Sequence, residues 1–182
     1  ERDLLSSINA AARIQTALLP TLEFQDITLQ AKWLPLDVVG GDIYVVQEEL
    51  NRTIVAVIDC TGHGVQGSFL SVLAHTAFHS TIADHKQANA GQLLQEMQLR
   101  MIATLAKAGE TQAQEGFDGS ICVFYGDSNI CEFAGINASI LVVNKQGKSN
   151  FIEGTKILNK IPDNIKMGTQ LIEFKDNQIL MF

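Results

Sequence analysis

The sequence predicts an α+β domain in which antiparallel sheets carry helices on their outer faces. After an opening helix come strand-like segments up to residue 60, then two helical segments in succession, then strand-like segments again. A parallel α/β sheet would instead show strands and helices in regular alternation. The 182 residues suffice for one domain, and a content of 46% hydrophobic residues supports a buried core.

The opening helix is predicted over residues 3–19. Apolar side chains recur at three- and four-residue intervals from Leu4 to Leu19, and Pro20 ends the pattern. Two interpretations stay open. The segment is either an ordinary helix packed on the domain or a linker helix from an upstream sensor, dimeric like a short coiled coil.

Three strand-like segments come next. Residues 27–33 alternate apolar and polar side chains, which is the period of a half-buried strand. Residues 38–46 form an apolar strand that Gly40 and Gly41 interrupt. Residues 53–58 are a compact β-branched run, so we expect a central strand there.

Two adjacent helices and a set of hairpins complete the pattern. The helices are predicted over residues 65–83 and 90–108, and Gly109 closes the second. Turn residues at 126–129 and 145–148 predict hairpins. The strands expected around these turns are 120–125, 130–134 and 140–143, and residues 171–174 and 178–182 are expected to pair with each other.

Charge and cysteine content exclude several classes of function. The net charge of -7, without clustered Lys and Arg, argues against a nucleic-acid partner. Cys60, Cys122 and Cys131 are odd in number and too widely spaced for a disulfide framework or a zinc knuckle. No signal peptide or membrane-spanning run is visible, so we expect a cytoplasmic domain, with a membrane anchor elsewhere in the parent protein left open.

Two glycine–aspartate elements are the candidates for chemistry. Gly40-Gly41-Asp42 places a carboxylate where the backbone is cleared, and Asp59 ends a buried strand before Gly62-His63-Gly64. Each aspartate alone is equally compatible with a turn or capping role. Together they favour an oxygen-rich Mg²⁺ or Mn²⁺ site. For His63 we expect an exposed tight turn and hydrogen bonding rather than metal binding.

Ordered motifs along the chain carry a family resemblance. They are Ala12-Arg13-Ile14-Gln15, Leu18-Leu19-Pro20, Val39-Gly40-Gly41-Asp42, Asp59-Cys60-Thr61-Gly62-His63-Gly64, and then Glu115-Gly116-Phe117-Asp118-Gly119 and Phe133-Ala134-Gly135-Ile136-Asn137. Together they resemble the PPM (protein phosphatase 2C-like) family, in its bacterial stress-response and sporulation branch. The resemblance implies a four-layer α-β-β-α sandwich of two antiparallel sheets flanked by helices, with two Mn²⁺ or Mg²⁺ ions at one end.

The resemblance also implies a set of metal ligands. Asp59 would bridge both ions, the backbone carbonyl of Cys60 would bind one of them, and Asp42 would bind an ion or its waters. The further acidic ligand is either Glu115 or Asp118, and we prefer Asp118 because an aspartate so close to the strand is typical of this branch. The turn residues Gly41, Gly62, His63 and Gly64 would lie near the substrate.

Such ions make a nucleophilic side chain unnecessary, because they lower the pKa of a bound water. In agreement, the sequence shows no Ser-His-Asp arrangement and no Cys-x5-Arg motif. A nucleotide-binding interpretation of Gly62-His63-Gly64 fails, because the Lys-Ser/Thr of a P-loop and the three-glycine dinucleotide fingerprint are missing.

In the family, the last strand runs into a Thr/Ser-Asp-Gly motif whose aspartate completes the cluster. Here the matching strand, residues 178–182, closes the sequence, and neither Asp163 nor Asp176 stands in such a motif. We therefore expect a C-terminally incomplete domain that binds metal poorly and is weakly active or inactive alone. Residues 1–20 are assigned to a linker or regulatory helix, and residues 21–182 to a phosphatase domain truncated before its last metal-ligand motif.

The functional hypothesis is a metal-dependent protein serine/threonine phosphatase in bacterial signalling. Its expected substrate is a phosphorylated regulatory protein, such as an anti-sigma-factor antagonist. An upstream sensor domain or homodimerisation would act through the opening helix. A second hypothesis stays open, in which a degenerate and catalytically weak phosphatase fold serves as a binding or sensing module.

Overall fold

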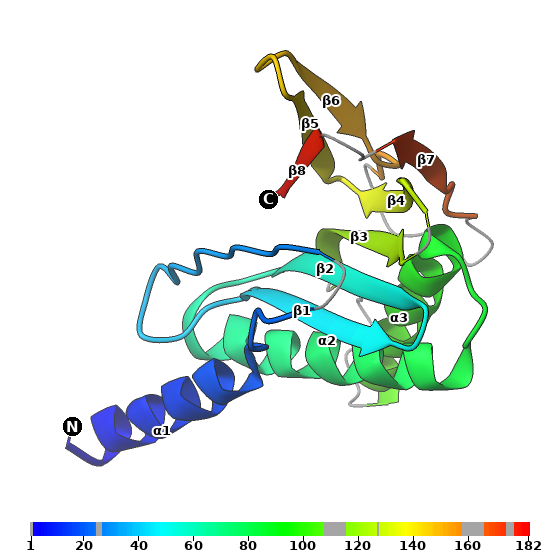
Figure 1. The fold of residues 1–182 in the computed structure, drawn as a ribbon. Coiled ribbons are helices and arrows are strands. Elements are labelled where there is room, and N and C mark those ends of the chain that lie inside the picture. Colours follow the sequence, from blue (N-terminus) through cyan, green and yellow to red (C-terminus); the bar gives the residue numbers. More distant parts are fainter. Residues whose placement is uncertain (1, 25–26, 108–115, 127, 158–165, 174–176) are drawn as a thin grey trace.

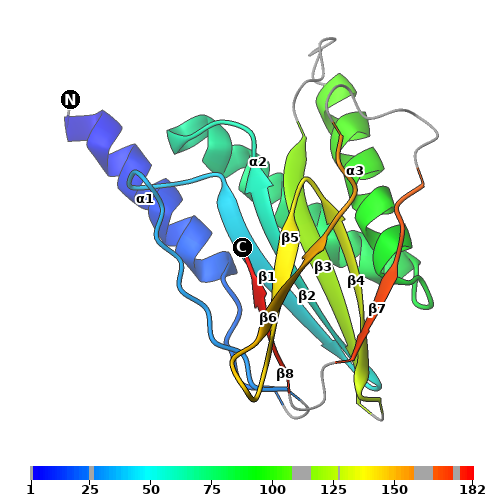
Figure 2. The same cartoon turned by 90° about the horizontal axis from the view of Figure 1, so that it is seen from above.

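The computed structural model describes residues 2–24, 27–107, 116–126, 128–157, 166–173 and 177–182. Two antiparallel sheets lie face to face, and two helices cover the outer face of the larger sheet (Figures 1 and 2). The larger sheet has five strands in the order β1-β2-β3-β4-β7. Their bounds are Asp42–Glu49 (β1), Arg52–Cys60 (β2), Phe117–Tyr125 (β3), Ile130–Ile136 (β4) and Gln170–Glu173 (β7).

The smaller sheet has three strands in the order β6-β5-β8. They span Ser149–Glu153 (β6), Ser139–Asn144 (β5) and Asn177–Met181 (β8). The helices are α1 (Arg2–Leu18), α2 (Gly64–Asp84) and α3 (Ala90–Lys107). In the described part of the chain, none of the helices combines the length and the apolar character needed to cross a bilayer.

Two apolar cores form because the five-stranded sheet buries side chains on both faces. On one face, α2 and α3 pack their apolar stripes onto the strands, and Phe78 and Met97 are fully enclosed. On the other face, the smaller sheet covers Cys122, Cys131 and Phe133. Alternate residues of one strand therefore reach different cores, which is why the interior strand β2 is buried at nearly every position.

The predicted fold class is confirmed, with two antiparallel sheets flanked by helices. The described residues supply three of the expected layers, namely α2 with α3, the larger sheet and the smaller sheet (Figure 2). No helix in the described part packs on the outer face of the smaller sheet. Helix α1 extends from the edge of the molecule and contacts α2 near its own C-terminal end (Figure 1).

Two predictions about strands are wrong. Residues 27–33 are extended but form no strand: Ile27 and Leu29 pack on the core between the sheets, as the alternation indicates, without a hydrogen-bonded neighbouring strand. The last two strands do not pair with each other. β7 adds to β4 and β8 adds to β5, so the two strands extend different sheets and place Ile172 and Met181 on one shared core.

A further difference concerns the strand predicted over residues 38–46, which begins only after its two glycines. β1 starts at Asp42, and Gly40 and Gly41 lie in the approach to it. The aspartate is therefore the first residue of the strand rather than a residue in its middle.

Replacing Phe78 should destabilise the domain strongly, because the ring is fully buried between α2 and the sheet. We expect Phe78→Ala to lower the free energy of unfolding by about 3–5 kcal/mol, measured by urea denaturation. Phe69, on the same helix but 70% exposed, provides the control. Phe69→Ala should change stability by no more than about 0.5 kcal/mol, and equal effects of the two changes would contradict this assignment of the core.

Candidate metal centre

Three aspartates lie side by side across three neighbouring strands. Asp42 is directly opposite Asp59 in the β1–β2 pairing, and Asp59 is directly opposite Asp118 in the β2–β3 pairing. Directly opposite residues project from the same face of a sheet, so the three carboxylates share one face. All three are exposed. We call Asp42, Asp59 and Asp118 the aspartate row.

The aspartate row lies at the open end of the space between the two sheets. Along the same strands, residues further along the same face include Val46, Val55 and Cys122, which the smaller sheet buries. A cleft of about 600 Å³ runs from Asp42 and Asp59 into this space. Its walls are mostly apolar, so the carboxylates form the polar end of an otherwise apolar cleft.

Mutual repulsion and partial burial make the charge on the row unfavourable. The pKa of Asp59 is raised to about 6, first by desolvation, then by its hydrogen bond to Asp42 and by the charges of Asp42 and Asp118. A cation bound to the row would remove this repulsion. By favouring the charged form, such a cation would also lower the pKa of Asp59.

The backbone around the row explains its glycines. A side chain at Gly41 would place its Cβ 2.6 Å from the Cys60 carbonyl oxygen and 2.9 Å from that of Gly62. A Cβ at Gly67 would lie 2.7 Å from the same Gly62 oxygen. The backbones at Gly41 and Gly67 can approach these carbonyl oxygens only because neither residue has a side chain. The close approach brings the Cys60 carbonyl, an expected ligand, against the residue that precedes Asp42.

The Cys60 side chain takes no part in the row. Its sulfur is buried in the core beneath α2, where desolvation first, and then the charges of Asp59 and Asp42, raise its pKa to about 12. The thiol therefore stays protonated near neutral pH, and thiolate is the form that binds metals. Only the backbone carbonyl of Cys60 remains as a donor.

His63 and its flanking glycines form the turn from β2 into α2. Gly62 and Gly64 have φ values of 93° and 61°, which favour glycine. The His63 side chain is 82% exposed, and its Nδ1 lies 3.8 Å from Oδ2 of Asp37. His63 occupies the N-cap position of α2 without a side-chain capping bond. The expected exposed turn is present, while a role for His63 in substrate binding stays a prediction.

The other predicted acidic residues cannot be placed. Glu115, the alternative to Asp118, lies outside the described residues, as do Asp163 and Asp176. Within the described ranges, the register sets Asp118 next to Asp59, as a ligand would require. That Asp118 binds metal remains a prediction.

The donors of the row fit a hard divalent cation in their chemistry. Carboxylate and carbonyl oxygens are the ligands that Mg²⁺ and Mn²⁺ prefer. Among the described residues, however, no three His, Cys, Asp or Glu side chains converge closely enough to enclose an ion. Neighbouring strands hold successive aspartates roughly 5 Å apart at Cα, so the middle residue, Asp59, has a carboxylate on either side. Waters would supply further ligands, as is usual for Mg²⁺.

Gln15 is a functional candidate to which the sequence pattern gave no role. It is buried, and its amide forms a two-point contact with Gly40: Oε1 accepts from the Gly40 N–H at 3.1 Å and Nε2 donates to the Gly40 carbonyl at 2.6 Å. Nε2 also donates to Ser71 Oγ of α2 at 2.8 Å. Helix α1 is thereby attached two residues before Asp42. The sequence feature that could have indicated this role is a polar glutamine within the apolar stripe of the helix, on the same face as Ala11 and Leu18.

Gln98 makes a similar contact from α3. Its buried amide donates from Nε2 to the Phe117 carbonyl at 2.8 Å, directly before Asp118. Its Oε1 has no hydrogen-bond partner among the described residues. The preceding Gly116 carbonyl accepts from the N–H of Thr61 at 3.3 Å. The segment that leads into Asp118 is therefore held by α3 on one side and by the turn after Asp59 on the other.

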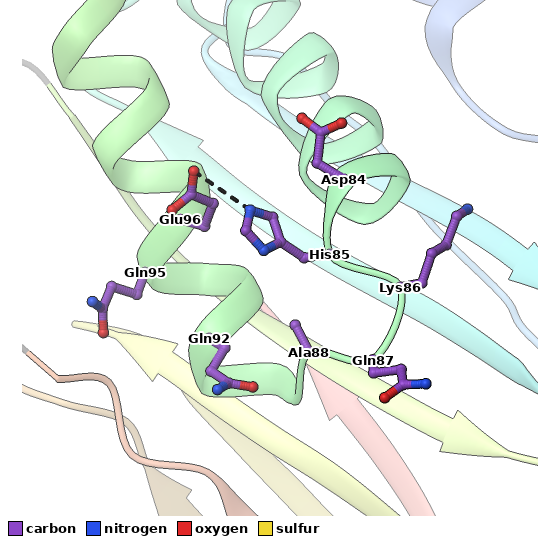
Figure 3. Close-up of a pocket in the computed structure, with 8 residues that line it drawn as sticks. All are labelled: Asp84, His85, Lys86, Gln87, Ala88, Gln92, Gln95 and Glu96. Atoms are coloured by element: carbon purple, nitrogen blue, oxygen red, sulfur yellow. Dashed lines mark ion pairs between the residues drawn. The ribbon is translucent and has the colours of Figure 1, made fainter.

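A second hollow, of about 660 Å³, lies where the end of α2 meets the start of α3 (Figure 3). His85 and Glu96 face each other there, with Nε2 of the imidazole 3.7 Å from Oε1 of the carboxylate. Helix α2 has 21 residues, so this hollow is about 30 Å along its axis from the turn after Asp59. Lys86 stands beside the carboxylates of Asp84 and Glu96 in its lining, so charges of both signs are present there. The aspartate row, where three carboxylates adjoin one another, is the stronger candidate site.

Comparison with known proteins agrees with this architecture. A family model for stage II sporulation protein E (SpoIIE) matches residues 50–182. A search of curated protein sequences gave no significant match. Among solved structures, the SiaA-PP2C domain of Pseudomonas aeruginosa is similar with a TM-score of 0.81 and 24% identity, over 99% of this chain and 71% of that one.

Two further solved structures share the fold at lower identity. The PP2C phosphatase domain of SpoIIE from Bacillus subtilis has a TM-score of 0.59 and 13% identity, over 75% of this chain and 38% of that one. RsbX in complex with magnesium has a TM-score of 0.53 and 14% identity, over 75% of this chain and 62% of that one. The chain thus spans less than two thirds of either of these two proteins.

Removing the middle charge of the row should stabilise the metal-free protein. Because the pKa of Asp59 is raised from 3.8 to about 6, its contribution to stability is complete below pH 3.8 and is lost as the pH rises through 6. After allowance for solvent screening, we expect Asp59→Asn to raise the free energy of unfolding at pH 7 by about 1 kcal/mol.

The measurement is urea denaturation of both proteins in EDTA between pH 3.5 and 8. The advantage of the variant should shrink steadily towards the acid end, where Asp59 is protonated in both the folded and the unfolded chain. A stability difference that does not change with pH would contradict the electrostatic explanation.

Proposed function

This chain belongs to the SpoIIE family, and from that premise we propose that it is the catalytic part of a metal-dependent protein serine/threonine phosphatase. Its fold is that of PP2C phosphatase domains of bacterial regulatory proteins, so the resemblance found in the sequence motifs is confirmed. The observation that carries the proposal is the aspartate row, in which three carboxylates are in register on adjacent strands. Such a row is unfavourable unless cations occupy it.

Two Mn²⁺ or Mg²⁺ ions are the cofactors that we propose. When bound, they would activate a water for attack on phosphorus and neutralise the phosphate oxygens. Asp59, at the centre of the row, would bind both ions, while Asp42 and the Cys60 carbonyl would hold one side. Asp118 would hold the other. The magnesium complex of RsbX supports this choice of ion by analogy of fold.

The proposed substrate is phosphoserine or phosphothreonine on a regulatory partner protein, such as an anti-sigma-factor antagonist. All three carboxylates of the row are exposed at the rim of the sandwich. A phosphate carried on the surface of a protein could therefore reach them without first entering a deep pocket. Membership of the SpoIIE family supports a regulatory setting for such a substrate.

Helix α1 is proposed as the element through which an upstream sensor domain or a second copy tunes activity. The buried Gln15 connects this helix to Gly40 and to α2. A neighbouring face of the helix is open to a partner, since Ile14 is 59% exposed. A displacement of α1 would thus move the backbone that leads directly into Asp42.

One observation favours the second candidate, a degenerate phosphatase fold that serves as a binding or sensing module. The described side chains do not enclose an ion by themselves. In that case the aspartate row would be a remnant of a metal site, and Mn²⁺ would not bind even in a longer version of the protein.

The proposal predicts Mn²⁺ binding that depends on Asp59. By calorimetric titration, we expect weak binding to this chain, tighter binding to a version extended past Phe182, and loss of binding in Asp59→Asn in both. Turnover of p-nitrophenyl phosphate in Mn²⁺ should follow the same order. Asp84→Asn is the matched control, because this carboxylate lies at the far end of α2.

The outcomes separate the two candidate functions. Binding and turnover lost only in the Asp59 variant support the phosphatase. An extended protein that binds no Mn²⁺ supports the binding module. Equal and robust turnover by both lengths of the unmodified protein would refute the expectation that this chain is weakly active alone.

The role of α1 is tested by changes on its two faces. Gln15→Ala removes the contacts to Gly40 and Ser71, and we expect Mn²⁺-dependent turnover to fall several-fold because Asp42 loses its support. Ile14→Asp alters the exposed face. It should change how the parent protein is activated while the turnover of the isolated domain stays the same.

Thr16→Ala is the control for both changes, since this side chain is exposed and lies one residue after Gln15 and two after Ile14. Full turnover in Gln15→Ala would show that the glutamine only packs the helix. Normal activation of a full-length protein that carries Ile14→Asp would make α1 a purely structural element.

A further inference from the structure

Asn137 lies at the point where the chain passes from one sheet to the other. It follows β4 of the larger sheet and precedes β5 of the smaller sheet. Its φ is 51°, and no other non-glycine residue in the described ranges has a positive φ. This left-handed conformation is unfavourable for most residues with a side chain, whereas asparagine tolerates it. An unfavourable backbone at this position calls for a compensating role of the side chain.

The side-chain amide of Asn137 is fully engaged. Its Oδ1 accepts a hydrogen bond from the N–H of Ile157 at 2.7 Å. Its Nδ2 donates to the Ile157 carbonyl at 3.1 Å and to Oδ1 of Asp118 at 2.9 Å. A backbone N–H can only donate, so the oxygen of the amide must face Ile157 and the nitrogen must face the aspartate.

Asn137 therefore extends the aspartate row by one strand. The β3–β4 pairing ends with Gly119 opposite Ile136, so the next positions along these strands are Asp118 and Asn137. Asp118 has a like charge, Asp59, on one side and a neutral donor, Asn137, on the other. The donor holds one carboxylate oxygen on the side away from Asp59.

We propose that Asn137 is a positioning residue for the cation site. It occupies Oδ1 of Asp118 and leaves Oδ2 free for the cation, which fixes the direction from which this carboxylate binds. The same amide binds Ile157, and the backbone N–H of Asn137 donates to the Thr155 carbonyl, so Asn137 also connects residues 155–157 to the aspartate row. This inference rests on the proposed function, because it needs a cation that binds to the row.

Terbium(III) is a suitable probe of the row. It binds oxygen donors, and its luminescence is sensitised by a nearby tryptophan. The sequence has a single tryptophan, Trp33, whose Nε1 donates to the Asp42 carbonyl at 2.9 Å. Excitation of Trp33 therefore reports terbium at the aspartate row itself. Competition with Mn²⁺ then gives the affinity for the proposed ion.

The variant Asn137→Gly keeps the positive φ and removes only the side-chain amide. We expect it to weaken terbium and Mn²⁺ binding about tenfold. Asn144→Gly is the matched control. This asparagine accepts hydrogen bonds from the N–H groups of Gln146 and Lys148 in the β5–β6 turn and touches no aspartate of the row. Its binding should equal that of the unmodified chain.

A double-mutant cycle separates positioning from general damage to the fold. If Asn137 acts through Asp118, then Asp118→Asn combined with Asn137→Gly should bind no more weakly than Asp118→Asn alone. Losses that add independently, or an unchanged affinity in Asn137→Gly, would overturn the inference and leave the proposed function intact. An unmodified chain that binds neither ion, even at millimolar concentration, would overturn the metal site and this inference together.

Discussion

Like-charge repulsion along the aspartate row is the constraint around which this end of the molecule is organised. Antiparallel register puts Asp42, Asp59 and Asp118 on one face of adjacent strands, where each charge raises the cost of the next. A free chain would separate such charges. The sheet cannot, because the register that aligns them also places the apolar side chains of β1, β2 and β3 in both cores. Core packing thus holds together like charges that repel one another.

The supports of the row are neutral amides from three separate elements. Gln15 of α1 binds Gly40, Gln98 of α3 binds the Phe117 carbonyl, and Asn137 binds Asp118 itself. An amide can fix a backbone or a carboxylate by hydrogen bonds without adding charge. A lysine or arginine at these positions would compete with a metal ion for the same carboxylates. Neutral supports keep the full negative charge of the row available to a cation.

This arrangement accounts for a local conflict between stability and function. The protonated state of Asp59 is favoured by its surroundings, and Gly41 and Gly67 give up side-chain contacts so that backbone carbonyls can approach. These features weaken the metal-free protein. Such features are expected at a site where bound cations offset the repulsion between carboxylates and so restore stability. The large core beneath α2 and α3, remote from solvent, supplies the stability that the row lacks.

The sequence by itself determined the features that depend only on residues close together in the chain, namely the helices and the glycine turns. Apolar periods predicted the three helices within a few residues of their observed ends, and paired glycines beside Asp42 and Asp59 indicated a close approach of backbones. Pairing was decided only by the tertiary structure: β7 and β8 joined different sheets, and residues 27–33 stayed without a partner. The neighbours of Asp118 were decided in the same way, as were the contacts of Gln15 and Asn137. Strand pairing and buried amide contacts join residues far apart in the chain, and they depend on which faces the cores must cover, so no local pattern encodes them.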